Sequence, residues 1–208
     1  MSTTPGQNIR IFDREENPFG KPWDTWTEDW WKWILSIPKD RNPIYDTTGE
    51  NCNVDQKNPN VWFLAGALSG SVKRKCSIPA GKAILVPIAV NECSRAEFKK
   101  ETDLAECASS GNVVISMAAS INGESIEKSE LEKYRVKTRE FNLSICPNNV
   151  FDTEPGTTTA VSDGYWLFLR PLSGGNILNL QLNQSTQDDD RSRTINCSYE
   201  VSYVLTII

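Results

Sequence analysis

The sequence predicts a mainly β fold, a β-sandwich or jelly-roll of about eight to ten antiparallel strands with one Trp-rich helix near the N-terminus. Short apolar segments separated by turn residues recur from residue 61 to the C-terminus, and one helical stripe precedes them. The chain has 208 residues, 38% hydrophobic and 24% charged, as is typical of one domain. We therefore expect a flexible N-terminal arm over residues 1–20 and a single domain over residues 21–208.

The predicted helix follows this polar arm. Thr25 and Glu28 have the spacing of a capping box, in which each side chain bonds the other residue's backbone amide, so we expect the helix to begin at Thr25. Ile37 precedes Pro38 and disfavours helical backbone, which predicts an end near Ser36.

Most apolar side chains of this helix share one face. Trp31 and Leu35 fall off that face. The helix is therefore either covered on two sides, which we favour, or it presents Trp31 and Leu35 as a contact surface for a glycan, a peptide or another subunit. The shared face comprises Trp26, Trp30, Trp33, Ile34 and Ile37.

Strands are predicted for the rest of the chain. Residues 61–68 and 83–90 are continuous apolar runs, which is typical of strands that are buried on both faces. Residues 113–121 precede Asn122-Gly123, a strong hairpin signal, and should pair with residues 124–127.

Further strands are expected over residues 134–138, 141–145 and 165–170, with a Thr-rich loop over residues 154–159. After Gly174-Gly175 the sequence alternates, which predicts one dry and one wet face. The dry face holds Leu178, Leu180 and Leu182, and the wet face holds Asn179, Gln181 and Asn183.

The end of the chain should contain an acidic loop and one long strand. Asp188, Asp189 and Asp190 indicate the loop, and residues 197–208 form the strand. Its buried face holds Tyr199, Val201, Tyr203, Leu205 and Ile207.

Composition excludes several classes of function. The chain lacks His, which removes Ser-His-Asp and Cys-His nucleophiles and His-based zinc sites. Its 22 basic and 27 acidic residues give a net charge of −5, which argues against nucleic acid as the main ligand. No apolar run reaches the ~18 residues of a transmembrane helix.

The cysteines predict an oxidising compartment. None of the six lies in a CxxC pair, so three disulfides are favoured over a zinc or redox site. Six buried, reduced cysteines in a cytosolic chain are the alternative. The pairing stays open, although a Cys93–Cys107 bond would close a loop over residues 94–106. The six are Cys52, Cys76, Cys93, Cys107, Cys146 and Cys197.

We accordingly expect a secreted or otherwise extracytoplasmic protein. The sequence begins with a polar segment and lacks an apolar signal core, so export implies that a signal peptide or anchor was removed and Met1 added.

Three stretches resemble an uncharacterised family of exported bacterial and archaeal proteins. They are the Trp-rich helix that ends at Ile37-Pro38, the Pro-Ala-Gly-Lys turn within residues 76–88, and the Asp-Gly-Tyr-Trp strand within residues 161–175. The resemblance covers residues 23–208 and implies an extracytoplasmic β-sandwich without an established activity. Where that family often has a His after the glycine turn, this chain has Asn176, which puts any role of that His in doubt.

Carboxylate pairs are the remaining catalytic device, as in jelly-roll glycoside hydrolases. Glu92 and Asp163 lie at predicted strand ends, where turn and capping bonds are the simpler interpretation, and Glu200 lies on a solvated face. Arg170 follows Trp166 and Phe168 on one strand face and suits either a structural salt bridge, which we favour, or an anionic ligand.

A calcium site is a weaker hypothesis, and no metal site is assigned. Residues 51, 53 and 55 have the 1-3-5 spacing of an EF-hand, but Gln56 and Trp62 replace its Gly and Glu. A looser structural calcium site from Asp46, Glu50 or residues 188–190 is the alternative.

Binding is the favoured function, rather than catalysis. We predict a disulfide-stabilised, secreted or cell-surface module for a glycan or an extracellular protein, with Trp23, Trp31 and Trp62 as exposed carbohydrate-binding platforms. One alternative is a structural subunit or homo-oligomer that assembles through its N-terminal arm or its last strand. A second alternative is a carboxylate-dependent glycoside hydrolase.

Overall fold

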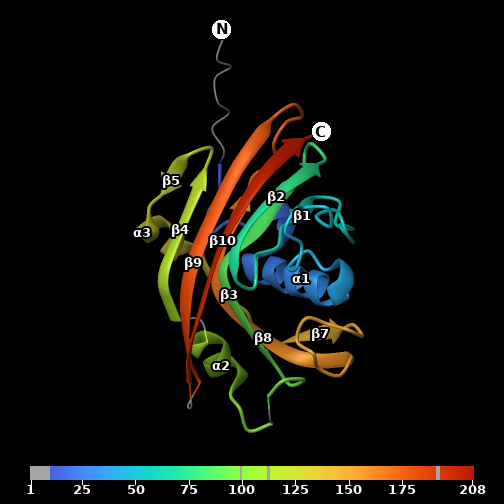
Figure 1. Ribbon diagram of the computed structural model, residues 1–208, viewed down its shortest axis with the longest axis vertical. Coiled ribbons are helices and arrows are strands. Elements are labelled where there is room, and N and C mark those ends of the chain that lie inside the picture. The colour runs from blue at the N-terminus through green and yellow to red at the C-terminus, as the bar shows by residue number, and fades with distance from the viewer. Residues whose placement is uncertain (1–9, 99, 112, 191–192) are drawn as a thin grey trace.

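The computed structural model describes residues 10–98, 100–111, 113–190 and 193–208, and within these ranges it describes the side chains of all but 187–190 and 193–197. The fold is mainly β, with two five-stranded sheets that share one hydrophobic core (Figure 1). The β3–β8 sheet contains β1 (Val61–Phe63), β3 (Ala83–Ser94), β8 (Gly156–Leu169), β6 (Arg135–Lys137) and β7 (Phe141–Ile145). The β9–β10 sheet contains β2 (Gly70–Ile78), β10 (Arg193–Ile207), β9 (Ile177–Asp190), β4 (Val113–Ile121) and β5 (Glu124–Ile126).

Both sheets are mixed, whereas the sequence predicted antiparallel strands. β1 runs parallel to β3, and β2 runs parallel to β10. The order in the second sheet is β2-β10-β9-β4-β5, so β2 lies beside a strand more than a hundred residues away in sequence. Hydrophobic alternation sets which face of a strand is buried but not which partner it has, and so it could not reveal these parallel pairs.

The helix α1 (Trp23–Leu35) begins two residues earlier than predicted. Its N-cap is Pro22, which has no side-chain cap, and the Thr27 hydroxyl donates to the Asp24 carbonyl (2.8 Å). The predicted Thr25–Glu28 capping box is therefore wrong, because Pro22 already has the extended backbone that precedes a helix. The predicted end is confirmed, since Ser36 is the C-cap.

All five Trp of α1 are buried, which confirms that the helix is covered on two sides. Their indole N–H groups donate to the segments that surround the helix. The recorded bonds run from Trp23 to the Asp13 carbonyl, Trp26 to the Pro18 carbonyl, Trp30 to the Leu64 carbonyl, Trp31 to the Ser162 hydroxyl and Trp33 to the Val54 carbonyl.

Several strands match their predicted bounds, and others differ. The predictions for β4, β7 and the β4–β5 hairpin are confirmed. β1 ends at Phe63, and β2 was missed because its Lys- and Arg-rich sequence hides the alternation. The predicted loops at residues 154–159 and 188–190 are largely strand, since β8 begins at Gly156 and β9 continues to Asp190. In both places a neighbouring strand supplies the backbone partners, β7 for the start of β8 and β10 for the end of β9.

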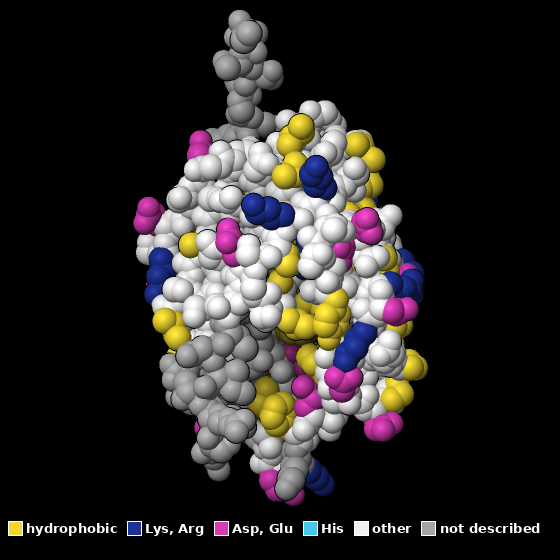
Figure 2. All heavy atoms as spheres, viewed as in Figure 1, with side chains coloured by type: hydrophobic (Ala, Val, Ile, Leu, Met, Phe, Trp, Pro, Cys, Tyr) yellow, Lys and Arg dark blue, Asp and Glu magenta, His cyan; other side chains and the backbone are white. Residues whose placement is uncertain are grey.

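The faces of β9 follow the predicted alternation: Leu178, Leu180 and Leu182 are buried, and Asn179, Gln181 and Asn183 are exposed. Figure 2 shows the outer side of this sheet as mostly uncharged surface. The inner face of β10 is also confirmed at Val201, Tyr203, Leu205 and Ile207, which are buried, whereas Tyr199 on the same face is half-buried.

Short helices that the sequence did not reveal connect the strands. The helix α2 (Leu104–Ser110) is capped by Asp103, whose carboxylate accepts from the amides of Ala105 and Glu106. The helix α3 (Lys128–Leu131) continues into a 3-10 turn, Glu132–Tyr134. Two further 3-10 turns span Pro18–Gly20 and Lys39–Arg41.

The predicted arm is wrong over residues 10–20, and residues 1–9 lie outside the described ranges. Phe12 is buried, its amide donates to the Phe168 carbonyl (2.8 Å), and its ring lies 5.0 Å from the Phe168 ring. This segment thus packs against the end of β8, because Phe12 adds an apolar side chain to the aromatic cluster of α1.

Two disulfides are confirmed, Cys52–Cys76 and Cys93–Cys107. The third predicted bond is wrong at Cys146, which is a free thiol, and the Cys197 side chain lies outside the described residues. Burial raises the pKa of the Cys146 thiol. Within the described ranges no helix is long and apolar enough to cross a membrane.

Candidate functional site

The predicted carbohydrate platforms do not exist. Trp23, Trp31 and Trp62 are all buried, and Trp23 stacks on Tyr134 with ring centroids 5.7 Å apart. A sugar ring therefore cannot reach these indoles. Trp23 and Trp31 are buried because the Trp residues of α1 form the packing layer between this helix and the β3–β8 sheet.

The two candidate acids lie on opposite faces of one sheet. Glu92 pairs with Ser162 across β3 and β8, whereas Asp163 pairs with Asn91. Successive residues of a strand point to opposite faces, so the two carboxylates cannot face each other across a cleft. The predicted glycosidase-type pair is thus not assembled by Glu92 and Asp163.

The other candidates have structural partners. Arg170 donates to Glu16 (2.7 Å) and covers the Phe12 ring, so it makes the favoured salt bridge. Asp46 accepts from the backbone amides of Thr48, Gly49 and Asn51, which uses its oxygens in a turn. Among described side chains no three acidic or cysteine groups converge in a way that could hold a metal.

Asp163 ties three elements together on its face of the sheet. Arg135 of β6 donates to both carboxylate oxygens, each at 2.8 Å. Ser109 of α2 donates to Oδ2 (2.8 Å), and the Lys137 ammonium lies 3.2 Å from the same oxygen. Burial alone would raise the pKa of Asp163, but these donors outweigh it and hold the pKa below its ordinary value.

This cluster is not a nucleophile system. Lys137 also donates to the Ser109 hydroxyl (3.1 Å), which superficially resembles a Ser–Lys dyad. A dyad needs a buried amine that is free to accept the hydroxyl proton, but the Lys137 side chain is 58% exposed and forms an ion pair with Asp163. The cluster therefore fixes the position of α2 and β6 over β8.

A hollow that we call the β4 groove opens beside this cluster. Its volume is 330 Å³, and it lies between the two sheets, with α2 at one end and α3 at the other. Arg135 lies over the Tyr165 ring at 5.5 Å, which sets one wall, and Met117 is buried beneath the opposite wall. The lining residues are Ser109, Val113, Val114, Met117, Lys128, Glu132, Arg135 and Tyr165.

One wall of the β4 groove is an open strand edge. β5 pairs only with Ala119, Ser120 and Ile121, so the first six residues of β4 have no described strand partner on that side. The register against β9 shifts between Val114 and Ser116, which marks a β-bulge. Val113 and Ile115 are 49% and 51% exposed at this edge.

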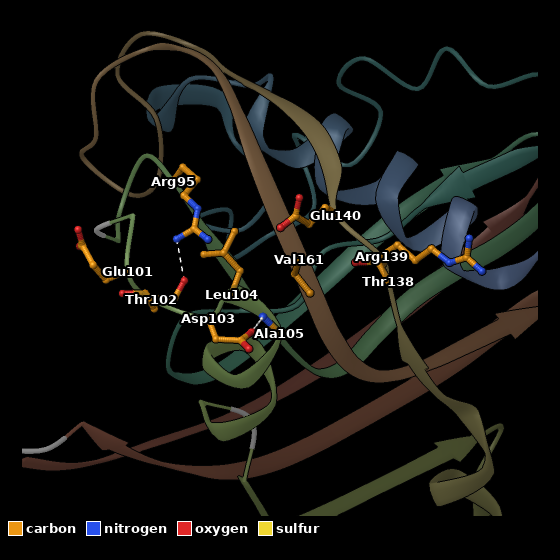
Figure 3. Close-up of a pocket in the computed structure, with 10 residues that line it drawn as sticks. All are labelled: Arg95, Glu101, Thr102, Asp103, Leu104, Ala105, Thr138, Arg139, Glu140 and Val161. Atoms are coloured by element: carbon orange, nitrogen blue, oxygen red, sulfur yellow. Dashed lines mark hydrogen bonds between the residues drawn. The ribbon is translucent and has the colours of Figure 1, made fainter.

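A second, more polar hollow lies around Arg95 (Figure 3). Its volume is 390 Å³, its floor contains Leu104 and Val161, and the Arg95 guanidinium donates to the Thr102 carbonyl (2.8 Å). In Figure 3, Arg139 points away from the other lining residues. A further hollow of 500 Å³ adjoins Arg95 beside residues 154–159. Both are shallow surfaces with charges of both signs.

Glu92 is a buried acid near the end of β3. It is 5% exposed, and neither carboxylate oxygen has a hydrogen-bond donor among the described residues. Its carboxyl interacts with that of Glu97, and burial first, then Glu97, raises the pKa of Glu92 to about 9. The Ser94 hydroxyl donates to Glu97 instead (2.9 Å).

The β4 groove was missed in the sequence because six separate elements build it. One signal was present, since Val113, Val114 and Ile115 are three consecutive apolar residues at the start of an otherwise alternating strand. Such a run leaves an apolar side chain on the outer face, which strict alternation would not do.

Neither the protein-family models nor the curated proteins contain a match to this chain. One solved structure, that of PbICP-C in complex with falcipain-2, contains a similar chain. The similarity has a TM-score of 0.27 at 10% sequence identity, and it covers 72% of this chain and 99% of the other. At this TM-score it carries no argument about function.

Proposed function

We propose that this protein is an exported, disulfide-stabilised binding domain that takes an extended segment of a protein partner into the β4 groove. The observation that carries the proposal is the open, apolar edge of β4, with Val113 and Ile115 about half exposed beside a hollow between the sheets. Two disulfides are compatible with an extracytoplasmic location.

An extended segment suits this site because an open edge offers backbone N–H and C=O groups in strand geometry. A peptide that adds to the edge satisfies those groups, and its alternate side chains enter the groove. Natural proteins usually protect such an edge with charged residues, with Pro or with a covering segment. The start of β4 instead carries Val113, Val114 and Ile115.

The groove is also preorganised. Asp163 holds α2 and β6 through Ser109, Arg135 and Lys137, so the wall opposite β4 does not have to be ordered by the ligand. Preorganisation lowers the entropy cost of binding. Tyr165 and Met117 supply the apolar contact area, and Arg135 supplies a cationic rim.

The test is selection from a displayed library of random twelve-residue peptides, followed by affinity measurement on synthetic peptides. Val113→Lys combined with Ile115→Lys should weaken binding at least tenfold, because lysines at the edge oppose strand addition. Ile177→Lys is the matched control, since Ile177 is 61% exposed in the same sheet but outside the groove.

Two results would overturn the proposal. One is that the selected peptides bind the Val113→Lys/Ile115→Lys variant as tightly as the unmodified protein. The other is that the unmodified protein selects no peptide but self-associates in sedimentation experiments, in a manner that the double substitution abolishes. The second result would favour a structural subunit, in which a second copy occupies the edge.

A further inference from the structure

A pair of carboxyl groups lies on the opposite face of the β3–β8 sheet from Asp163, at the end of β3. Glu92 is almost wholly buried, and the group that its carboxyl faces is a second acid, Glu97. Glu97 itself is exposed and accepts from the Ser94 hydroxyl at 2.9 Å. The Cys93–Cys107 disulfide fixes the chain next to Glu92.

Among the residues that the structure describes, this pair of acids has no basic partner. No Lys or Arg of the described residues forms an ion pair with Glu92 or Glu97. The Glu92 oxygens make no hydrogen bond of ordinary geometry among the described residues, although the Ser94 hydroxyl and the Glu97 carboxyl lie close enough to affect the pKa of Glu92. A buried carboxylate is stable only when a proton, a donor or a cation neutralises it. A divalent cation between the two acids would balance their charge completely.

We propose that Glu92 and Glu97 bind a calcium ion at the end of β3. Ca²⁺ accepts carboxylates, hydroxyls, backbone carbonyls and water in flexible geometry, and the Ser94 hydroxyl is the nearest recorded neutral oxygen. Glu97 gives the ion a route from solvent, and Glu92 supplies the buried anchor. In the absence of the ion the pair retains a proton, so binding of the ion releases that proton to solvent.

Trp31 provides a built-in probe of this site. Its indole donates to Ser162 (2.7 Å), and Ser162 is the cross-strand partner of Glu92. Tb³⁺ substitutes for Ca²⁺ and emits when a nearby Trp is excited. Titration of the unmodified protein with Tb³⁺ at neutral pH should therefore give saturable, Trp-sensitised emission, which added Ca²⁺ displaces.

Glu92→Gln should abolish this emission, and Glu97→Gln should weaken Tb³⁺ binding at least tenfold. Gln has the shape of protonated Glu, so both variants should stay folded, which the Trp emission maximum checks. Glu106→Gln is the matched control, because Glu106 is exposed on α2 beside the same disulfide. Unsaturable emission, or equal binding by the Glu92→Gln, Glu97→Gln and Glu106→Gln variants, overturns the proposal.

Discussion

Asp163 is the residue whose replacement tests the architecture of the groove most sharply. Asp163→Asn keeps the volume of the side chain but removes the charge that Arg135, Lys137 and Ser109 share. A hydrogen bond to a charged group contributes about 1.5–3 kcal/mol net. Because Arg135 and Lys137 are partly exposed and can be hydrated, we expect a total loss of roughly 2–3 kcal/mol.

The assay is urea unfolding followed by Trp fluorescence, which reports global unfolding because all seven Trp are buried. In thermal unfolding of a chain of this size, the same loss of stability should lower Tm by roughly 4–12 °C. Glu16→Gln is the control, since it breaks the more exposed Arg170–Glu16 pair and should cost less than about 0.5 kcal/mol. If the free energy of unfolding of Asp163→Asn lies within about 0.5 kcal/mol of that of the unmodified protein, Asp163 does not hold α2 and β6 in place over β8.

Three further predictions concern acid stability and the cysteines. The donors of Asp163 hold its pKa below 3.8, so its contribution to the free energy of unfolding is complete above that pH and is lost as the pH falls through the folded-state pKa. Urea midpoints measured down this pH range should therefore fall less steeply in Asp163→Asn than in the unmodified protein. Replacing Cys93 and Cys107 by Ser, which removes a bridge with a sequence separation of 14, should cost about 3 kcal/mol in the same assay, and a loss near zero would contradict the structure. Alkylation of the denatured, unreduced protein should label Cys146 but not Cys93 or Cys107, as read by peptide mass spectrometry, and an unlabelled Cys146 would show that it is bonded.

Local patterns predicted the strands well where a strand has one dry and one wet face. The strand β7, with Phe141, Leu143 and Ile145 buried, and the Leu face of β9 follow directly from period-two alternation. The capping motif at Thr25 failed because Pro22 set the helix start, and residues 154–159 failed as a loop because β7 supplies strand partners for β-branched Thr residues. These outcomes depend on neighbours that a local pattern does not contain.

The site was less accessible to sequence reasoning than the fold. Asp163 was identified as a candidate acid, but its role as a tie depends on Ser109 and Arg135, which reach it from separate elements. Glu92 was also identified, whereas Glu97 was not, because it lies in a polar loop with no strand or helix pattern. The Trp residues were predicted to form exposed binding platforms, but their side chains are buried in the core.

The most direct test of the account is amide hydrogen exchange of the unmodified protein with and without a selected peptide. We predict that the peptide slows exchange in the first half of β4, within Val113–Ile121, because the bound strand pairs with this edge. Tyr165 should show the accompanying change in its environment. Protection confined to the hollow around Arg95, with exchange in β4 unchanged, would contradict the central claim.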